Sequence, residues 1–150
     1  MTTYERLISE LGNGLGIALA PDGGGVTQLF AENRFVLLHA DETGERELTV
    51  FSVIALAPED GFPPETLKRA LAMNFFGHEV VGHHLGLFAD SLILSASLPI
   101  TDLAAETLAE RIVMLARLAN TLSGSLACPE PAAAPADDTP PCLGGNFVVA

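Results

Sequence analysis

The stretch HHLGLFADSLILSASLPI, residues 83–100, decides the fold, because it has the pattern of two short strands around a tight turn at residues 89–90. From residue 92 to residue 98 every second side chain is apolar, which is typical of a strand with one buried face. An apolar helical segment precedes this stretch, and Thr101-Asp102 begins a long helical pattern after it. The sequence therefore predicts a β-hairpin between two helices.

The first residues have the pattern of a short amphipathic helix. Thr2 and Glu5 have the spacing of a capping box, in which each side chain binds a free backbone N–H at the helix start. Gly12 is expected to end the helix, because glycine readily adopts the left-handed conformation found after a helix end. The apolar side chains recur at helical spacing, at Tyr4, Leu7, Ile8 and Leu11.

Three strands are predicted next, at residues 26–31, 34–40 and 47–56. Glu32-Asn33 fits a two-residue hairpin turn between the first two strands. The third strand is apolar on both faces, as expected for a strand at the centre of a sheet. One of its faces is expected to carry Leu48, Val50, Ile54 and Leu56.

Two further helices are predicted, from residues 63–64 to residue 76 and from about residue 102 to residue 123. The earlier one is apolar around most of its circumference, which in so small a domain favours an interface with another chain. The later one has an inner apolar stripe of Leu108, Ile112, Leu115, Ala119 and Leu122.

The composition combines a large negative charge with an apolar sequence. The formal net charge is −12, from 19 acidic and 7 basic residues, yet 49% of residues are hydrophobic and the mean hydropathy is +0.38. Because phosphate binding depends on lysine and arginine, this charge argues against nucleic acid as a partner. A domain of this size buries only about two-thirds of its unfolded surface. We therefore expect apolar side chains to remain exposed unless a partner covers them.

The chain is expected to be one domain at residues 1–126 followed by a disordered Pro/Ala-rich tail at residues 127–150. No secretory signal and no stretch long enough to span or insert into a membrane is recognisable. Cys128 and Cys142 both lie in the tail, and free thiols of an intracellular protein are favoured there over a disulfide. A cytoplasmic location follows as the expectation.

No motif indicates catalysis. His78, Glu79 and His83 resemble a zinc-protease motif, but the second histidine is at i+5 and so lies on a different helical face from the first. The glycines at residues 12–16 follow a helix instead of opening one, unlike a phosphate-binding loop. No cofactor, metal site or catalytic residue is expected. A small metal-dependent hydrolase using His78, His83 and His84 is the alternative from another functional class.

Four segments together resemble the class I type III secretion chaperones, the Tir-chaperone (CesT-like) family. The resemblance covers residues 4–124, and its segments are LISELGNGLGIAL, GGGVTQLFAENRFVLLHAD, LKRALAMNFFG and LGLFADSLILSASLPI. With the order α-β-β-β-α-β-β-α, it implies an α+β fold, a twisted and mostly antiparallel five-stranded sheet with three helices. Helices one and three are expected to pack on the sheet.

The resemblance implies a bacterial, cytoplasmic homodimer that binds the N-terminal segment of a secreted effector in extended form and keeps it competent for export. It makes the export ATPase a further candidate partner. A chaperone-like regulator that sequesters a secretion or transcription component is the alternative with the same fold. The implied client-binding residues are Leu7, Leu11, Ile17, Leu29, Phe30, Val36 and Leu38. The implied dimer residues are Leu67, Leu71, Phe75 and Phe76, with the strands after helix two completing the dimer surface.

Overall fold

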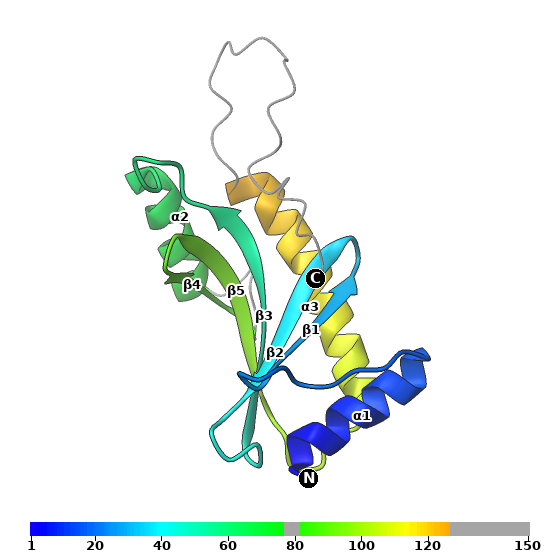
Figure 1. Ribbon diagram of the computed structural model, residues 1–150. Coiled ribbons are helices and arrows are strands. Elements are labelled where there is room, and N and C mark those ends of the chain that lie inside the picture. Colours follow the sequence, from blue (N-terminus) through cyan, green and yellow to red (C-terminus); the bar gives the residue numbers. More distant parts are fainter. Residues whose placement is uncertain (77–81, 127–150) are drawn as a thin grey trace.

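The fold is α+β, with three helices and one antiparallel sheet of five strands in the order β1-β2-β3-β5-β4 (Figure 1). The computed structural model describes residues 1–76 and 82–126, so that His78, both cysteines and the tail lie outside the described residues. The predicted order of elements is confirmed. The elements are α1 (Thr3–Leu15), β1 (Val26–Ala31), β2 (Arg34–Ala40), β3 (Glu47–Leu56), α2 (Pro64–Phe76), β4 (His84–Phe88), β5 (Ser91–Pro99) and α3 (Ala105–Leu126).

The two predicted hairpins are both present. Strands β4 and β5 pair from His84 with Ser95 to Phe88 with Ser91, and Ala89 in the turn has a φ of 49°. In the β1–β2 turn, Glu32 and Asn33 both have positive φ, at 52° and 61°. Positive φ at both central residues is the geometry of the two-residue turn that matches the twist of paired strands.

Strand β3 occupies the predicted central position, but one of its residues lies on the other face from the one expected. The register of β3 against β5 shifts between Val53 and Ala55, as in a β-bulge. An extra residue in one strand reverses the alternation of every side chain that follows it. Ala55 is therefore buried, whereas Leu56, which we expected beside Ile54, is 42% exposed.

Helix α1 begins as predicted but continues beyond Gly12. The capping box is formed, since Thr2 Oγ1 accepts from the Glu5 N–H at 3.1 Å and Glu5 Oε2 accepts from the Thr2 N–H at 2.7 Å. The helix ends at Gly16, which has the left-handed φ of 70°. A Cβ at Gly12 would lie 2.7 Å from the carbonyl oxygen of Ile17. Gly12 thus allows the chain that follows α1 to pass close to the helix, but Gly12 does not end the helix.

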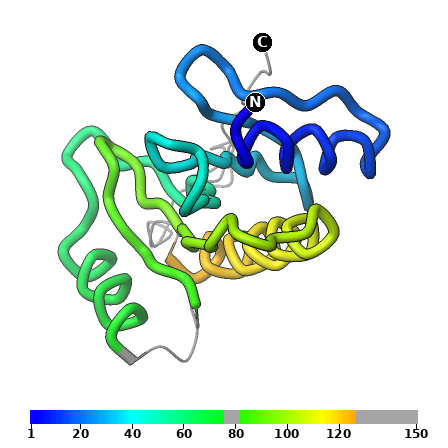
Figure 2. Tube along the Cα trace, turned by 90° about the horizontal axis from the view of Figure 1, so that it is seen from below, coloured from blue at the N-terminus to red at the C-terminus, as the bar shows by residue number. Residues whose placement is uncertain are grey.

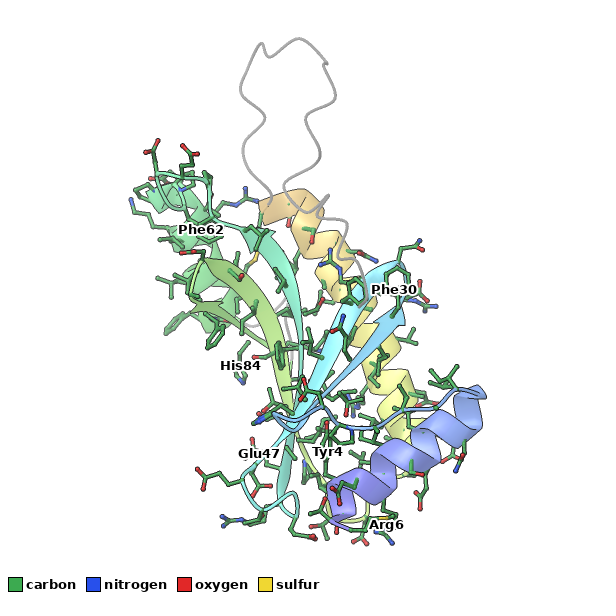
Figure 3. The ribbon with its side chains drawn as sticks, in the orientation of Figure 1. Tyr4, Arg6, Phe30, Glu47, Phe62 and His84 are labelled. Atoms are coloured by element: carbon green, nitrogen blue, oxygen red, sulfur yellow. The ribbon has the colours of Figure 1, made fainter. Side chains whose placement is uncertain are left out.

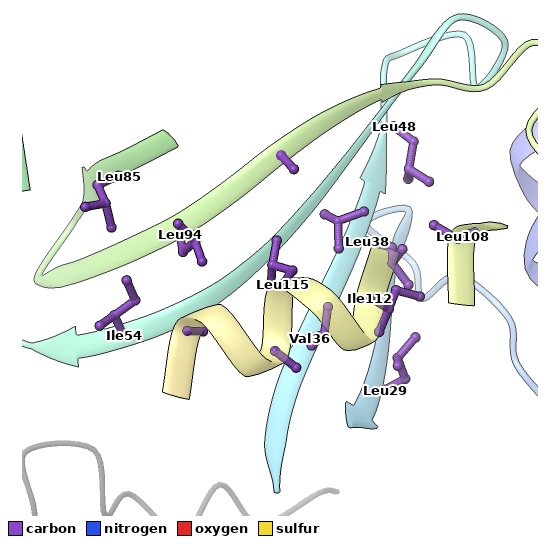
Figure 4. Close-up of a cluster of buried hydrophobic side chains, with 14 of the residues drawn as sticks. Leu29, Val36, Leu38, Leu48, Ile54, Leu85, Leu94, Leu108, Ile112 and Leu115 are labelled. Carbon is purple, nitrogen blue, oxygen red and sulfur yellow. The ribbon is translucent and has the colours of Figure 1, made fainter. Parts of the chain in front are cut away.

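Helix α3 begins three residues later than predicted, because Asp102 adopts a φ of 62° and is part of a turn. Its predicted inner stripe is confirmed as buried, and Arg111 and Arg117 lie off that stripe and are exposed. The stripe covers one face of the sheet, where α3 contacts β3, β2, β5 and β1 (Figure 4). The core therefore lies between α3 and this inner face.

Helices α1 and α2 lie at opposite ends of the molecule (Figures 1 and 2). Helix α1 packs against α3, and α2 packs against the edge strand β4. Tyr4 ties α1 to the sheet, because its hydroxyl forms hydrogen bonds with Thr27 Oγ1 at 2.7 Å and with the Leu38 carbonyl oxygen at 2.9 Å (Figure 3). The two ends are thus built from different helices.

The loop between β2 and β3 holds the start of α1. The Thr3 N–H donates to Glu45 Oε1 at 3.0 Å, and the Thr3 hydroxyl donates to Glu45 Oε2. The Tyr4 N–H donates to the Gly44 carbonyl at 3.0 Å. These Thr3 bonds, chiefly that of the hydroxyl, lower the pKa of the Glu45 carboxyl.

We expect this contact to weaken in acid. A carboxyl whose pKa is lower in the folded than in the unfolded chain stabilises the fold above its unfolded pKa of about 4.3. This stability is lost as the pH falls through the folded pKa. The urea midpoint should therefore fall more steeply below about pH 5 in the wild type than in Glu45→Gln. Equal slopes in urea unfolding of the two proteins would contradict the role of Glu45.

Candidate functional site

Five of the seven predicted client-binding side chains lie in the core of a single chain. Their exposed fractions are at most 8%, so they are not available to a partner in this conformation. We therefore remove them from the client-binding set, and Ile17 and Phe30 remain, exposed by 51% and 60%. The buried residues are Leu7, Leu11, Leu29, Val36 and Leu38.

The reason for this correction is that α1 and the first strands pack on the same side of the structure. The apolar stripe of α1 is buried with the α3 stripe and the inner sheet face in one core. The sequence predicts that apolar side chains remain exposed unless a partner covers them. The packing of α1 against α3 absorbs that stripe, so the exposed apolar side chains lie elsewhere.

The sheet face opposite α3, here called the outer face, carries one exposed apolar side chain, Phe30, beside several half-buried ones. Phe30 and Phe35 are directly opposed in the β1–β2 register and stack edge to face, with ring centroids 5.1 Å apart and an interplanar angle of 67°. Phe30 is exposed and Phe35 is half-buried. The half-buried apolar residues of the neighbouring strands on this face are Leu37, Phe51, Val53 and Ile93.

The second group of exposed apolar side chains lies on α2 and β4, here called the α2–β4 surface. Leu71 is 67% exposed and Phe75 is 84% exposed, whereas Leu67 is half-buried. The side chain of Phe76 lies outside the described residues. Sequence reasoning did not name Leu87 and Phe88, which are 55% and 74% exposed at the end of β4. The apolar side chains directly before the turn at residues 89–90 were the signal.

Asn74 fixes α2 against the edge of the sheet. Its Nδ2 donates to the Leu85 carbonyl at 2.7 Å, and its Oδ1 accepts from the Leu85 N–H at 2.8 Å. The side-chain amide thus occupies the backbone groups that an edge strand would otherwise offer to another strand. A polar residue within an otherwise apolar helix face is the sequence signal for this contact.

Replacing Asn74 by leucine is expected to lower the free energy of unfolding by about 2 kcal/mol, because the part-buried N–H and C=O of Leu85 lose their partner. Asn13→Ala is the matched control, since Asn13 is exposed on α1. Urea unfolding measures both variants. Equal stability of Asn74→Leu and the wild type would show that this contact does not hold α2.

A polar network joins the tip of the β1–β2 hairpin to the end of α3. Arg34 Nε donates to Asn120 Oδ1 at 2.9 Å, its Nη2 donates to Ser123 Oγ at 2.6 Å, and its Nη1 donates to the Val53 carbonyl. Arg117 pairs with Glu32 of the turn, with 3.2 Å between Nη2 and Oε1. The network places the last turns of α3 beside the strands that carry Phe30 and Phe35.

The hydrolase alternative requires side chains placed together so that they can hold a metal ion. Among residues 1–76 and 82–126, no cluster of three or more histidine, cysteine, aspartate or glutamate side chains is arranged to hold one. Of the histidines in the hydrolase alternative, His84 is exposed on β4 (Figure 3), His83 is half-buried, and His78 lies outside the described residues. None of the described helices meets the length and apolarity that a membrane span requires.

The family model of the Tir chaperone protein (CesT) family matches residues 6–123. Since this covers most of the chain, the protein belongs to that family, as the sequence resemblance predicted. It is thus a chaperone of the type III secretion class. No curated protein matches the chain significantly in sequence.

Several solved structures share the fold. The HopA1–SchA chaperone–effector complex matches with a TM-score of 0.61 at 20% identity, over 81% of this chain and 94% of that chain. The type III secretion chaperone SycH of Yersinia pestis, solved with a fragment of YscM2, matches with a TM-score of 0.60 at 22% identity, over 79% and 98%. The ExsC–ExsE complex matches with a TM-score of 0.69 at 18% identity, over 85% and 98%.

Proposed function

We propose that this chain is a cytoplasmic chaperone that binds the N-terminal segment of a secreted effector in extended form and keeps it competent for export. The observation that carries the proposal is the exposure of large apolar side chains at two separate places on one chain. One place is the outer face with Phe30, and the other is the α2–β4 surface, while Ile17 is exposed separately just after the end of α1. Exposed apolar side chains gathered in this way are typical of surfaces that bind other proteins.

The two places are proposed to have different partners. The α2–β4 surface is proposed to pair with its counterpart in a second copy, because Leu71 and Phe75 on one helix and Phe88 on the adjacent edge strand remain exposed in a single chain. The outer face and Ile17 are proposed to contact the client. Apolar contacts are non-directional, so such a surface accepts clients of varied sequence. The cost of ordering an extended client keeps the affinity moderate, which allows release to the export machinery.

The test is capture from the native host with the tagged full-length chain, followed by mass spectrometry. The expected result is a protein exported by the secretion system. Its N-terminal segment alone should bind, and the backbone amides of that segment should exchange hydrogen rapidly when it is unbound. Binding that requires the folded remainder of the captured protein would reject an extended client. It would favour the regulator that sequesters a folded component.

A further inference from the structure

The last turns of α3 contact the β1–β2 hairpin from the inner face of the sheet. Ser123, three residues before the end of α3, contacts Arg34 of β2, and the next residue, Phe35, lies on the outer face because successive strand side chains point to opposite faces. Asn120 Nδ2 also donates to the Glu32 carbonyl in the hairpin turn at 2.8 Å. Leu126, where α3 ends, therefore lies about one helical turn beyond the contact with β2.

The sequence of residues 127–150 has two parts of different character. Residues 127–142 contain five prolines and the acidic residues Glu130, Asp137 and Asp138, with no lysine or arginine. Residues 143–150, LGGNFVVA, contain no charged side chain and include Leu143, Phe147, Val148 and Val149. A flexible chain of the length that separates Leu126 from Phe147 spans about 25 Å on average, and proline extends it further. This length allows the apolar part to reach the outer face.

The charges of the hairpin tip and of residues 127–142 are opposite in sign. Arg34 is held by neutral acceptors, and none of the ion pairs among residues 1–76 and 82–126 includes it. Arg117 beside it is exposed, and its charge is shared only with Glu32 within the same described part. The hairpin tip thus carries two arginines against one glutamate, whereas the charged side chains of residues 127–142 are all acidic. In a chain with a net charge of −12, this local positive charge attracts the acidic linker.

We propose that residues 143–150 dock on the outer face of their own chain at Phe30 and Phe35 and compete there with the client. The consequence for clients rests on the proposed function, whereas the docking itself does not. The linker gives the apolar segment a high effective concentration, in the millimolar range for short flexible linkers, so weak contacts suffice. A client must then bind more tightly than this internal segment, which covers the apolar face when no client is present.

The native cysteines allow a direct test, because the chain contains only Cys128 and Cys142. Full-length protein with Cys128→Ser is spin-labelled at Cys142, and paramagnetic broadening of the amide resonances is measured by NMR. We expect broadening at residues 28–37 and none on α2 or β4. Phe147→Asp should remove the broadening, and the linker variant Ala134→Asp should retain it. Broadening confined to α2 and β4, or to the apolar hollow on α3 around Val113 and Met114, would overturn the proposal.

A mixed sample tests whether the segment binds its own chain. Spin-labelled protein without isotope is mixed with isotope-labelled protein without spin label. Broadening that persists in this mixture would show a second copy as the occupant and overturn docking within one chain. Absence of broadening in both samples would also overturn the proposal.

Binding of the dye ANS, which reports exposed apolar surface, tests the masking separately from any client. If the segment is docked in about nine of ten molecules, only about one in ten can bind a competing dye. Deletion of residues 143–150 should then lower the apparent Kd for the dye about tenfold. Phe30→Asp in the deleted protein should reverse this gain, and an unchanged Kd after deletion would overturn the proposal. Docking without capture of any exported protein would instead reject the proposed function and leave this inference standing.

Discussion

Leu29→Asp is expected to unfold the protein, whereas Phe30→Asp, one residue further along β1, is expected to leave the fold intact and weaken client binding. Leu29 is 8% exposed in the core, so the substitution removes a buried leucine and places a carboxylate there. Together these effects cost about 4 kcal/mol or more, a large part of the 5–15 kcal/mol that usually stabilises a domain. Urea unfolding and circular dichroism measure this loss.

Phe30 faces the other side of the sheet and is 60% exposed. Its replacement removes the edge-to-face contact with Phe35, at a cost of about 1 kcal/mol. Loss of an aromatic residue that is central to an interface typically costs 2 kcal/mol or more, so client affinity should fall about 30-fold. Isothermal titration with the N-terminal segment of the captured client measures this affinity.

Gln28→Asp is the matched control for Phe30→Asp, because Gln28 is exposed on the same face of the same strand. It introduces the same charge without removing an apolar side chain, and it should bind the client nearly as well as the wild type. The opposite outcome would be a Leu29→Asp protein that folds but no longer binds the client, and a Phe30→Asp protein that binds it normally. This result would restore Leu29 as a client-binding residue. It would also reject the assignment of the outer face.

The double variant Leu71→Asp/Phe75→Asp is expected to convert the proposed dimer into monomers. Both side chains are largely exposed on α2 in one chain, so two carboxylates cost little in the monomer. In a dimer they would face a second copy of the same surface, and each of the four apolar side chains lost from the two copies is worth about 2 kcal/mol. The dissociation constant should therefore rise by more than about 1,000-fold, measured by sedimentation or light scattering over a range of concentrations.

Met114→Asp is the control for this variant, since Met114 is a large apolar residue, 53% exposed, on α3. It should remain dimeric. A Leu71→Asp/Phe75→Asp protein that keeps the mass of a dimer would place the dimer contact elsewhere. Unfolding of that variant by circular dichroism would show instead that α2 packs more closely than its exposure indicates.

The positions of the strands were predictable from sequence, because strand alternation and turn chemistry act between near neighbours. The β4–β5 hairpin follows from strict alternation around residues 89–90, and Glu32-Asn33 marks the other hairpin through its tolerance of positive φ. The capping box of Thr2 and Glu5 and the inner stripe of α3 were predicted for the same reason. Each of these features is decided within a few residues of chain.

The site was less predictable, because exposure depends on which elements meet. Leu7 lies within α1 and Ile17 lies two residues after its end, and both are apolar, yet one is 3% exposed and the other 51%. Asn74 has no partner nearby in sequence, since Leu85 lies eleven residues away on another element. Periodicity says that a side chain belongs to an apolar face, but it does not say whether a second element covers that face.

The sequence by itself determined the order of elements, the hairpins, the acidic and apolar character of the chain, and through these its chaperone family. Only the tertiary structure decided that α1 packs against α3, that a bulge turns Leu56 outward, and that Gly12 makes room for the passing chain. The physical reason is the distance along the chain over which each effect acts. Hydrogen-bonded turns and side-chain periodicity are local, whereas burial is a property of surfaces brought together from distant parts of the chain.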